Sequence, residues 1–257
     1  LIKGVKVFLS TENVRNMFSP VVLLEDELHQ IFNTYGEKSG ALFEAYRNII
    51  RRLYEKASEE DIEKLFIRHT LMQMIVSSCM TASSKKRTIS IRACSGAEVE
   101  IEIVLPYLNW WESLTTREME SSDSEFLNSL LGSVYSRALL LDWESGGKED
   151  IFRELYEILI DAETRRKIGE YYTPLWLVEY MTDKVFRDNK DLKGKLVLDP
   201  FCGSGTFLVT MFYKKVQEGQ DPDSAIREVI GFDINPLAVS IARAELMIAY
   251  QTLRKGV

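Results

Sequence analysis

The stretch KLVLDPFCGSGTFLV, residues 195–209, decides the fold of this chain. Its first half is a short apolar run, typical of a buried β-strand, that ends in Asp199 and Pro200. Two glycines follow, Gly203 and Gly205, which permit a tight turn and let the backbone approach a ligand without a Cβ in the way. The apolar residues after Gly205 predict a helix, so we interpret the stretch as strand, glycine turn and helix.

The same pattern occurs a second time further along the chain. Residues 228–233, EVIGFD, predict a second strand that ends at Asp233. Residues 235–253 predict a final helix, with Asn235 as its N-cap and Pro236 in its first turn. The order strand, helix, strand, helix implies right-handed crossovers and a parallel sheet.

The segment before the first strand is also predicted to be helical. Thr173 and Pro174 predict the N-cap and the first turn of a helix through residues 175–186. Parallel sheets are normally covered on both faces and built of several strands. Because this segment supplies only two clear strands, we expect the missing ones to come from later sequence, or a partner to cover the open edge.

The two strand-end acids would lie at the edge of such a sheet where ligands of α/β folds bind. A nucleoside triphosphate site would need a P-loop lysine, which GSGTF does not offer, and an NAD site would favour a third glycine where Leu208 stands. S-adenosylmethionine matches the residues better. Its ammonium group suits Asp199, its carboxylate suits backbone N–H groups at the start of the helix, and its ribose diol suits Asp233. An ordinary strand-to-helix turn without a ligand is the alternative.

Two domains are predicted. Residues 1–148 form a mainly helical N-terminal domain, residues 149–257 form the domain with the glycine turn, and SGGK at 145–148 is the linker. Within the first domain, alternating polar and apolar residues predict a β-hairpin at 88–104.

Several residues of the first domain have a structural and a functional interpretation. Residues 59–80 predict a central core helix because they are apolar nearly all round in their second half. His69 on this helix is more simply a hydrogen-bonded core residue. Trp110 and Trp111 could stack on bases, but core anchoring is the simpler reading. The basic run at 85–87 could contact a phosphate backbone, although such runs are usually solvated loops.

The composition excludes several classes of protein. The chain has 257 residues, of which 46% are hydrophobic and 28% charged, a globular profile. Its formal net charge of -7 gives no general attraction to nucleic acid, so DNA contacts must come from a local patch or from a part that is not present. Three cysteines and two histidines, widely spaced, argue against a disulfide framework and a metal site.

The sequence also predicts where the protein resides. No apolar run reaches membrane-spanning length, and the N-terminus lacks a signal-peptide cleavage pattern. We therefore expect a cytoplasmic protein that does not bind a membrane. The first residue is Leu1, so we expect the chain to be a piece of a longer product.

Three segments resemble a known family. DPFCGSGTFL at 199–208 resembles motif I of the N6-adenine DNA methyltransferases. GEYYTPLWLVEYM at 169–181 resembles their motif X, and GFDINPLAVSIARAEL at 231–246 is similar to their motif II. The order X, I, II is that of the γ class, seen in type I and type IIG restriction–modification enzymes, which often carry a helical domain ahead of the methylase.

The resemblance implies a role for each matching residue. Motif X would wall the methionine end of S-adenosylmethionine, motif I would form the floor, Asp233 would bind the ribose and Ile234 would lie against the adenine ring. The implied cofactor-binding residues are Tyr171, Tyr172, Thr173, Pro174, Asp199, Pro200, Gly203, Gly205, Asp233 and Ile234. Cys202 matches a variable position, and Phe201 and Phe207 are expected in the core.

One departure from the family pattern is large. The catalytic signature Asn/Asp-Pro-Pro-Tyr/Phe, which holds the amino group of a flipped adenine and stacks on its ring, does not occur in this sequence. The nearest string, NPLA at 235–238, lacks the aromatic residue, so we interpret it as a helix cap. We therefore expect no catalytic residue in this chain, and no activity from the chain alone.

The resemblance implies the N-terminal portion of an S-adenosylmethionine-dependent, adenine-specific DNA methyltransferase. Its architecture would be α/β, a helical domain followed by an incomplete Rossmann-like methyltransferase domain. Its partners would be double-stranded DNA and a specificity or restriction subunit or a fused nuclease. The alternatives are a non-catalytic cofactor-binding remnant or assembly subunit of a restriction system, and a methyltransferase that acts on RNA or protein.

Overall fold

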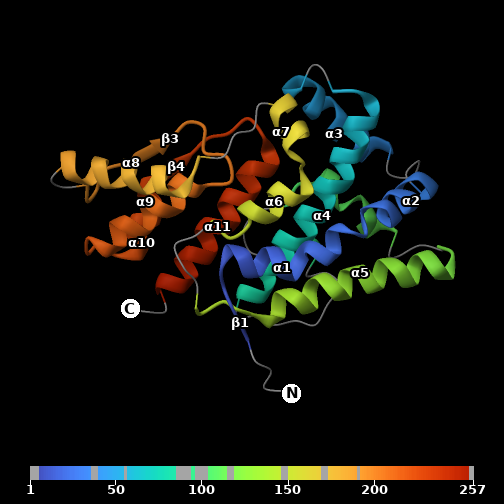
Figure 1. The fold of residues 1–257 in the computed structure, drawn as a ribbon, viewed down its shortest axis with the longest axis horizontal. Coiled ribbons are helices and arrows are strands. Elements are labelled where there is room, and N and C mark those ends of the chain that lie inside the picture. The colour runs from blue at the N-terminus through green and yellow to red at the C-terminus, as the bar shows by residue number, and fades with distance from the viewer. Residues whose placement is uncertain are drawn as a thin grey trace.

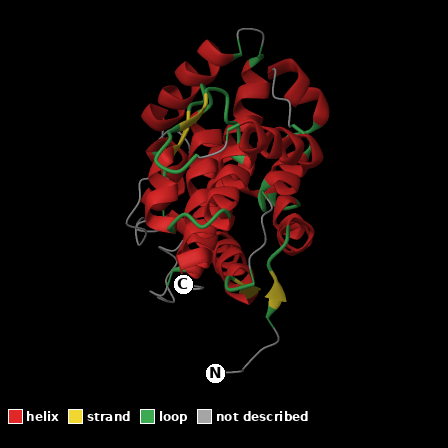
Figure 2. Ribbon diagram, turned by 90° about the vertical axis from the view of Figure 1, so that its left-hand side faces the viewer, coloured by secondary structure: helices red, strands yellow, loops and turns green. Residues whose placement is uncertain are grey.

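The computed structural model describes residues 6–35, 40–54, 57–84, 94–95, 104–114, 119–145, 150–168, 173–189 and 192–254. Within these ranges the chain is mainly helical, with two pairs of short parallel strands (Figure 1, Figure 2). None of the described helices combines the length and the apolar content needed to cross a membrane.

The elements are numbered along the chain in Figure 1. The α-helices are α1 (Thr11–Val22), α2 (Glu25–Tyr35), α3 (Gly40–Leu53), α4 (Glu59–Ser83), α5 (Ser121–Leu140), α6 (Arg153–Leu159), α7 (Ala162–Ile168), α8 (Leu175–Asp188), α9 (Thr206–Gln217), α10 (Pro222–Ala225) and α11 (Pro236–Arg254). The strands and 3-10 helices are β1 (Val7–Phe8), β2 (Leu141–Asp142), β3 (Val197–Asp199), β4 (Val229–Gly231), η3 (Pro106–Ser113) and η4 (Ile226–Glu228).

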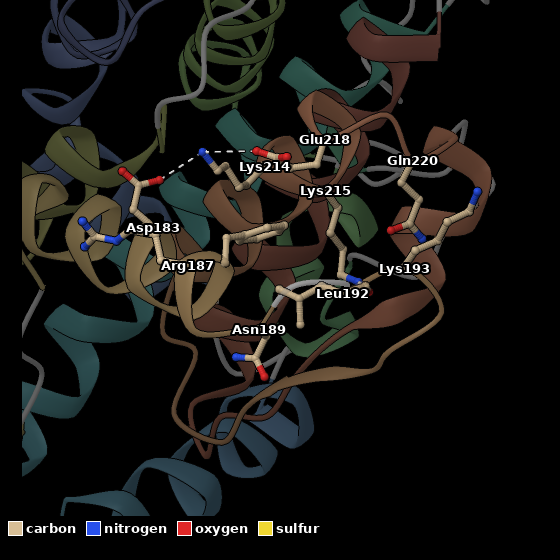
Figure 3. A pocket seen from close by; sticks show the side chains of 10 residues that line it. Asp183, Arg187, Asn189, Leu192, Lys193, Lys214, Lys215, Glu218 and Gln220 are labelled. Atoms are coloured by element: carbon tan, nitrogen blue, oxygen red, sulfur yellow. Dashed lines mark hydrogen bonds and ion pairs between the residues drawn. The ribbon is translucent and has the colours of Figure 1, made fainter.

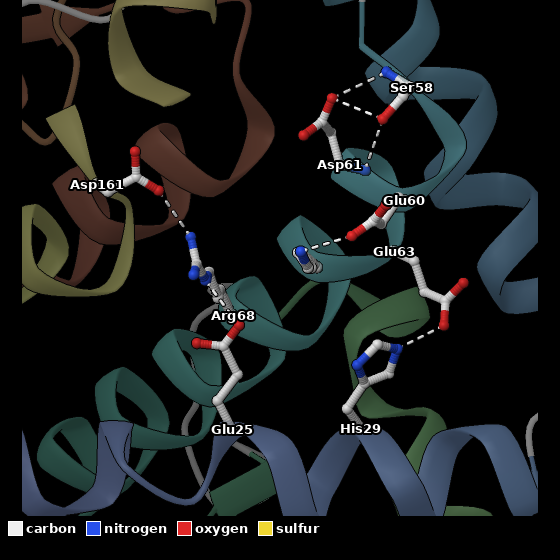
Figure 4. Close-up of polar contacts among 9 residues, drawn as sticks. Glu25, His29, Ser58, Glu60, Asp61, Glu63, Arg68 and Asp161 are labelled. Carbon is white, nitrogen blue, oxygen red and sulfur yellow. Dashed lines mark hydrogen bonds and ion pairs between the residues drawn. The ribbon is translucent and has the colours of Figure 1, made fainter. Parts of the chain in front are cut away.

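Helix α4 forms the centre of the helical half. It begins in a capping box, in which the Ser58 hydroxyl accepts the Asp61 N–H and the Asp61 carboxylate accepts the Ser58 N–H, both at 3.1 Å (Figure 4). Most of its side chains from Ile62 onward are buried, and α1, α2, α3, η3, α5, α6 and α11 pack around it. The core helix predicted at 59–80 is therefore confirmed.

Buried rings fill the space around α4. Trp110 and Trp111 are buried, and Trp110 Nε1 donates to the Thr70 hydroxyl at 3.0 Å. His69 is also buried, with the Tyr46 hydroxyl 3.0 Å from its Nδ1, and burial lowers the pKa of the imidazole to about 3. The histidine and both tryptophans are thus core residues, as the sequence predicted.

Charged side chains join α4 to its neighbours at the surface. Arg68 lies between Glu25 of α2, at 2.8 Å, and Asp161, at 3.0 Å, which directly precedes α7 (Figure 4). Because these groups are partly exposed, each pair contributes at most about 1 kcal/mol. They set the orientation of α2 and α7 more than they stabilise the fold.

Strands β3 and β4 pair in parallel, which confirms the pairing that the sequence predicted. Helix α9 forms most of the crossover, with α10 and η4 after it. One face of the pair is covered, because Val197 and Val229 belong to a second core with side chains of α9 such as Phe212.

The starts of two helices were predicted from their caps. Helix α11 begins at Pro236, and the Asn235 side chain accepts the Leu237 N–H at 3.0 Å, as expected. Helix α8 begins at Leu175, with Pro174 in the N-cap position and no side-chain hydrogen bond. The prediction of Thr173 as this cap was wrong. Pro174 has an extended backbone, with ψ 139°, so it cannot form the first helical residue and the helix starts one position later.

Helix α11 packs against both halves of the molecule (Figure 1). Its Ile241 and Ile248 belong to the core of the helical half, whereas Ala242 belongs to the core around α9. Apolar side chains of residues 151–160 also pack in the core of the helical half. Residues 146–149 lie outside the described part of the chain, so the domain boundary expected there stays a prediction.

Two predictions for the first half cannot be compared with the structure. The basic run at 85–87 lies outside the described residues, and so does nearly all of the hairpin expected at 88–104. Cys94 and Ser95, which are described within that range, are buried.

Lys215 of α9 is a fully buried cation that joins three segments, and Figure 3 shows it near Leu192. Its ammonium group donates to the Leu192 carbonyl at 2.7 Å, to the Lys195 carbonyl at 3.0 Å and to Glu228 Oε2 at 2.7 Å. The loop before β3 and the turn before β4 are therefore both held against α9.

We expect Lys215→Met to lower the free energy of unfolding by about 3 kcal/mol, because Glu228 and two carbonyl groups lose their buried donor. Lys214→Met is the matched control. Lys214 is partly exposed and pairs with Asp183 and Glu218 at 3.1 and 3.7 Å (Figure 3). Its loss should cost less than about 1 kcal/mol. Urea unfolding followed by circular dichroism measures both, and equal small losses would contradict the role given to Lys215.

Candidate functional site

The carboxyl ends of β3 and β4 lie side by side, since Asp199 is the register partner of Gly231. Beyond the strands, the Phe232 N–H donates to the Asp199 carbonyl and the Cys202 N–H donates to the Phe232 carbonyl, both at 2.9 Å. The loops that follow the two strands are therefore joined by backbone hydrogen bonds. They hold Asp199 and Asp233 at one edge of the sheet.

Two glycines in the left-handed region form the turn between β3 and α9. Gly203 has a φ of 51° and Gly205 a φ of 100°, which L side chains rarely adopt. Gly205 also lies against α11, where a Cβ built on it would be 2.9 Å from the Ala242 Cβ. Gly203 has open space around it, and its N–H donates to Asp233 Oδ2 at 2.9 Å. Gly205 thus allows α9 and α11 to pack closely, and Gly203 leaves open space beside Asp233.

Both strand-end acids are partly exposed and accept backbone N–H groups. Asp233 Oδ1 accepts the Asn235 N–H at 2.8 Å, while its Oδ2 accepts Gly203. Asp199 Oδ1 accepts the Phe201 N–H at 3.1 Å. Since each carboxylate oxygen can accept more than one hydrogen bond, both acids can still bind a donor from the solvent side.

Apolar side chains surround the acids on the solvent side. Phe201 is 81% exposed, Ile234 67% and Phe232 61%. The prediction that Phe201 lies in the core was wrong, because the Asp199 carboxylate holds the Phe201 N–H and the chain turns outward at this position. Pro200 beside it is exposed as well.

The start of α8 lies near the glycine turn. Leu175 and Thr206, the first residues of α8 and α9, line one cavity of about 670 Å³, whose other walls come mainly from α1, α6 and α7. Thr173 and Pro174 directly precede Leu175 and reach the surface. Tyr171 and Tyr172 lie outside the described residues, so their place in the site stays a prediction.

Sequence reasoning missed two residues of this region. A Cβ on Gly231 would be 2.5 Å from Leu208 Cδ1 and 2.9 Å from Cys202 Sγ, so the end of β4 requires glycine. An isolated glycine in a strand pattern was the available signal for such a close approach. The second is Asp150, whose carboxylate reaches Ser204 from 54 positions away along the chain. Its neighbours in the sequence give no signal of that contact.

Comparison with known proteins shows that the part of the chain with this site is similar to a known family. Residues 147–253, which contain β3, β4, the glycine turn and both acids, match the family model of the N-6 DNA methylases. We refer to residues 147–253 as the methylase segment, after the family model that they match. The methylase segment therefore ends close to the end of α11 and includes the cavity-lining residues of α6, α7 and α8.

The chain is similar to methylase subunits of type I restriction enzymes. It is 33% identical over 111 residues to the MjaIX methylase subunit of Methanocaldococcus jannaschii, and 33% identical over 85 residues to the EcoEI methylase subunit of Escherichia coli. These matches cover 40% and 33% of this chain, but 19% and 16% of the two relatives. The chain thus spans less than a fifth of their length.

The fold likeness extends to the helical half. A chain of the DrdV–DNA complex, solved by electron cryomicroscopy, matches 93% of this chain and 24% of its own length with a TM-score of 0.53. The sequence identity is 14%, so the similarity is one of fold. The likeness in fold covers residues 147–253 together with the helices before them.

We expect Gly205→Ala to lower the free energy of unfolding by about 3 kcal/mol, from left-handed backbone strain together with overpacking against Ala242. Gly203→Ala is the matched control. Gly203→Ala introduces the same backbone strain, but Gly203 has open space around it. The free energy of unfolding should therefore fall by only about 1 kcal/mol. Denaturant unfolding measures both variants, and equal losses would argue against a tight contact between α9 and α11.

Proposed function

We propose that this chain is the N-terminal, cofactor-binding portion of an adenine-specific DNA methyltransferase of a restriction–modification system. The methylase segment would be the first part of a Rossmann-like domain, and S-adenosylmethionine would be the methyl donor. One observation carries the proposal: Asp199 and Asp233 follow adjacent parallel strands, with a glycine turn between them, inside the N-6 DNA methylase segment.

The residues at the strand ends fit the chemical groups of S-adenosylmethionine. Asp199 would accept the ammonium group, and the free N–H groups at the start of α9 would bind the carboxylate. Asp233 would accept the ribose hydroxyls, and the exposed Ile234 would lie against the adenine ring. The open space at Gly203 leaves room for the methionine end.

The stretch before α8 would close the other side of the site. Tyr171 and Tyr172 would face the sulfonium, which is favourable because aromatic rings attract cations. Thr173 and Pro174 would continue this wall, and Pro200 would restrict the backbone after Asp199. Leu175, which directly follows Pro174, lines one cavity together with Thr206 at the start of α9, and this supports a place for the start of α8 near the glycine turn.

Methyl transfer needs more than the cofactor. The target adenine must leave the base stack, which costs a few kcal/mol, and its amino group must be aligned with the methyl group. Because the Asn/Asp-Pro-Pro-Tyr/Phe signature is missing from the 257 residues, we assign no catalytic residue to this chain. The full-length protein would act on double-stranded DNA in the cytoplasm, with a specificity or restriction subunit or a fused nuclease.

The chain is expected to bind S-adenosylmethionine, and Asp233→Ala should weaken binding roughly ten- to a hundredfold, because hydrogen bonds from the ribose to a charged acceptor are lost. Asp188→Ala, at the exposed end of α8, removes the same charge away from the site and should leave the affinity unchanged. Titration calorimetry measures all three proteins.

The controls separate the possible results of this titration. Asp233 also holds the Gly203 and Asn235 N–H groups, so circular dichroism must show that the variant is folded. If Asp233→Ala binds S-adenosylmethionine as tightly as the unaltered chain, Asp233 is not part of the site. No binding by the unaltered chain would refute cofactor binding by this portion of the protein.

The chain alone is expected to transfer no methyl group to DNA. Cofactor binding supplies one reactant, and the net charge of -7 offers no general attraction to phosphate that could replace a DNA-recognition surface. A tritiated-methyl transfer assay on mixed-sequence duplex DNA is the test. Incorporation above a no-protein control, abolished by Asp199→Ala, would show that the chain carries its own catalytic group.

A further inference from the structure

Asp150 is a buried carboxylate that reaches the glycine turn from the loop before α6. It is 4% exposed, and its Oδ2 accepts hydrogen bonds from the Ser204 hydroxyl at 2.5 Å and the Thr206 hydroxyl at 2.7 Å. These two residues flank Gly205. One carboxylate oxygen therefore binds the residues before and after Gly205, whose backbone is in the left-handed region.

The hydrogen bonds to Asp150 fix the turn, which has no side-chain cap of its own. Gly205 occupies the N-cap position of α9 and has no side chain to cap the helix. Glycine also leaves the backbone freer than any other residue. Hydrogen bonds from hydroxyl groups to a buried carboxylate are charge-assisted and stronger than bonds between neutral groups. The conformation of the turn thus depends on an acceptor oxygen outside it.

Asp150 is itself fixed in place. Its carbonyl accepts the Thr11 hydroxyl of α1 at 3.0 Å, and the next two residues, Ile151 and Phe152, are buried in the core of the helical half. The Phe152 N–H donates to Glu245 of α11 at 2.9 Å. The carboxylate is therefore tied to α1, to the helical core and, through Phe152, to α11.

Glu245 completes the surroundings of the Asp150 carboxylate. Asp150 Oδ1 is buried and has no donor in hydrogen-bonding geometry among the described residues, and the Glu245 carboxyl lies beside it. Burial and then the charge of Asp150 raise the pKa of Glu245 well above its ordinary value, while burial also raises the pKa of Asp150. Both shifts favour protonation, and the one at Glu245 is the stronger, so protonated Glu245 beside the Asp150 carboxylate is the favoured arrangement.

We propose that Asp150 is a positioning residue of the cofactor site. It fixes Ser204 and Thr206 so that the backbone N–H groups in the first turn of α9 keep the orientation that binds the methionine end of S-adenosylmethionine. The inference rests on the proposed function and extends it, because the affinity for the cofactor then depends on how the turn docks on the helical half.

Two substitutions of Asp150 separate positioning from general stability. Asp150→Ala removes the acceptor and should weaken cofactor binding at least about tenfold, since two charge-assisted hydrogen bonds are lost. It should also speed amide hydrogen exchange in residues 201–208 while exchange in α4 stays unchanged. Asp150→Asn keeps an oxygen for both hydroxyl groups and presents an N–H to Glu245, so its affinity should stay within about threefold of the unaltered chain.

Two further variants keep the test decisive. Thr206→Val has the same shape and removes one hydroxyl donor, so it should weaken binding by a smaller factor even where Asp150→Ala fails to fold. Glu245→Gln is the matched control. It keeps an acceptor for the Phe152 N–H and a donor for Asp150, and it should bind the cofactor as the unaltered chain does.

The outcomes distinguish this inference from the proposed function. Unchanged affinity in both Asp150→Ala and Thr206→Val would overturn it, and so would an equal rise of exchange in the turn and in α4. If the unaltered chain binds no S-adenosylmethionine, the proposed function fails. The exchange measurement then decides alone whether Asp150 holds the turn.

Discussion

The close approach of α9 and α11 at Gly205 is the constraint on which the rest of the site depends. A Cβ at this position would come within 2.9 Å of the Ala242 Cβ, so α9 can begin here only with a glycine. Helix α11 in turn buries Ile241 and Ile248 in the core of the helical half. One contact therefore fixes the glycine turn both against the sheet and against the helices that precede it.

The strand-end acids are positioned by backbone groups rather than by cations. Asp233 accepts the Gly203 and Asn235 N–H groups, and Asp199 accepts the Phe201 N–H. Within the described ranges, no lysine or arginine forms an ion pair with either acid. Their charge is thus available to a cationic or hydroxyl-bearing ligand, while the N–H groups at the start of α9 favour an anion. A ligand that carries an ammonium group, a carboxylate and sugar hydroxyls offers donors to the two acids and an anion to the N–H groups.

The features that could be predicted from the sequence are those that depend on neighbouring residues in the chain. The parallel strands and the Asn235 cap depend on patterns a few residues long, and both were found. Asp150 could not be predicted, because its partners Ser204 and Thr206 lie 54 and 56 positions away. The prediction for Phe201 was wrong for another reason. Apolar character predicts burial only on average, and here the Phe201 N–H donates to the Asp199 carboxylate where the chain turns outward.

The second face of the β3–β4 pair links the fold to the completion of the site. Leu198 and its register partner Ile230 share this face, where Leu198 is 54% and the preceding Leu196 68% exposed. The opposite face is covered by α9, and parallel sheets are normally covered on both. Burying each leucine fully would be favourable by about 2 kcal/mol, so this face is suited to a covering element, from the same protein or from a partner.

The position of this open face matters for the chemistry. It continues at the strand ends into the exposed Phe232, which lies between Gly231 and the proposed ribose-binding Asp233. An element that covers Leu198 would therefore also lie close to the proposed cofactor site near Ile234. Burial of this face and closure of the proposed ligand site would then occur together, which gives a physical reason why the strand-end acids are partly exposed.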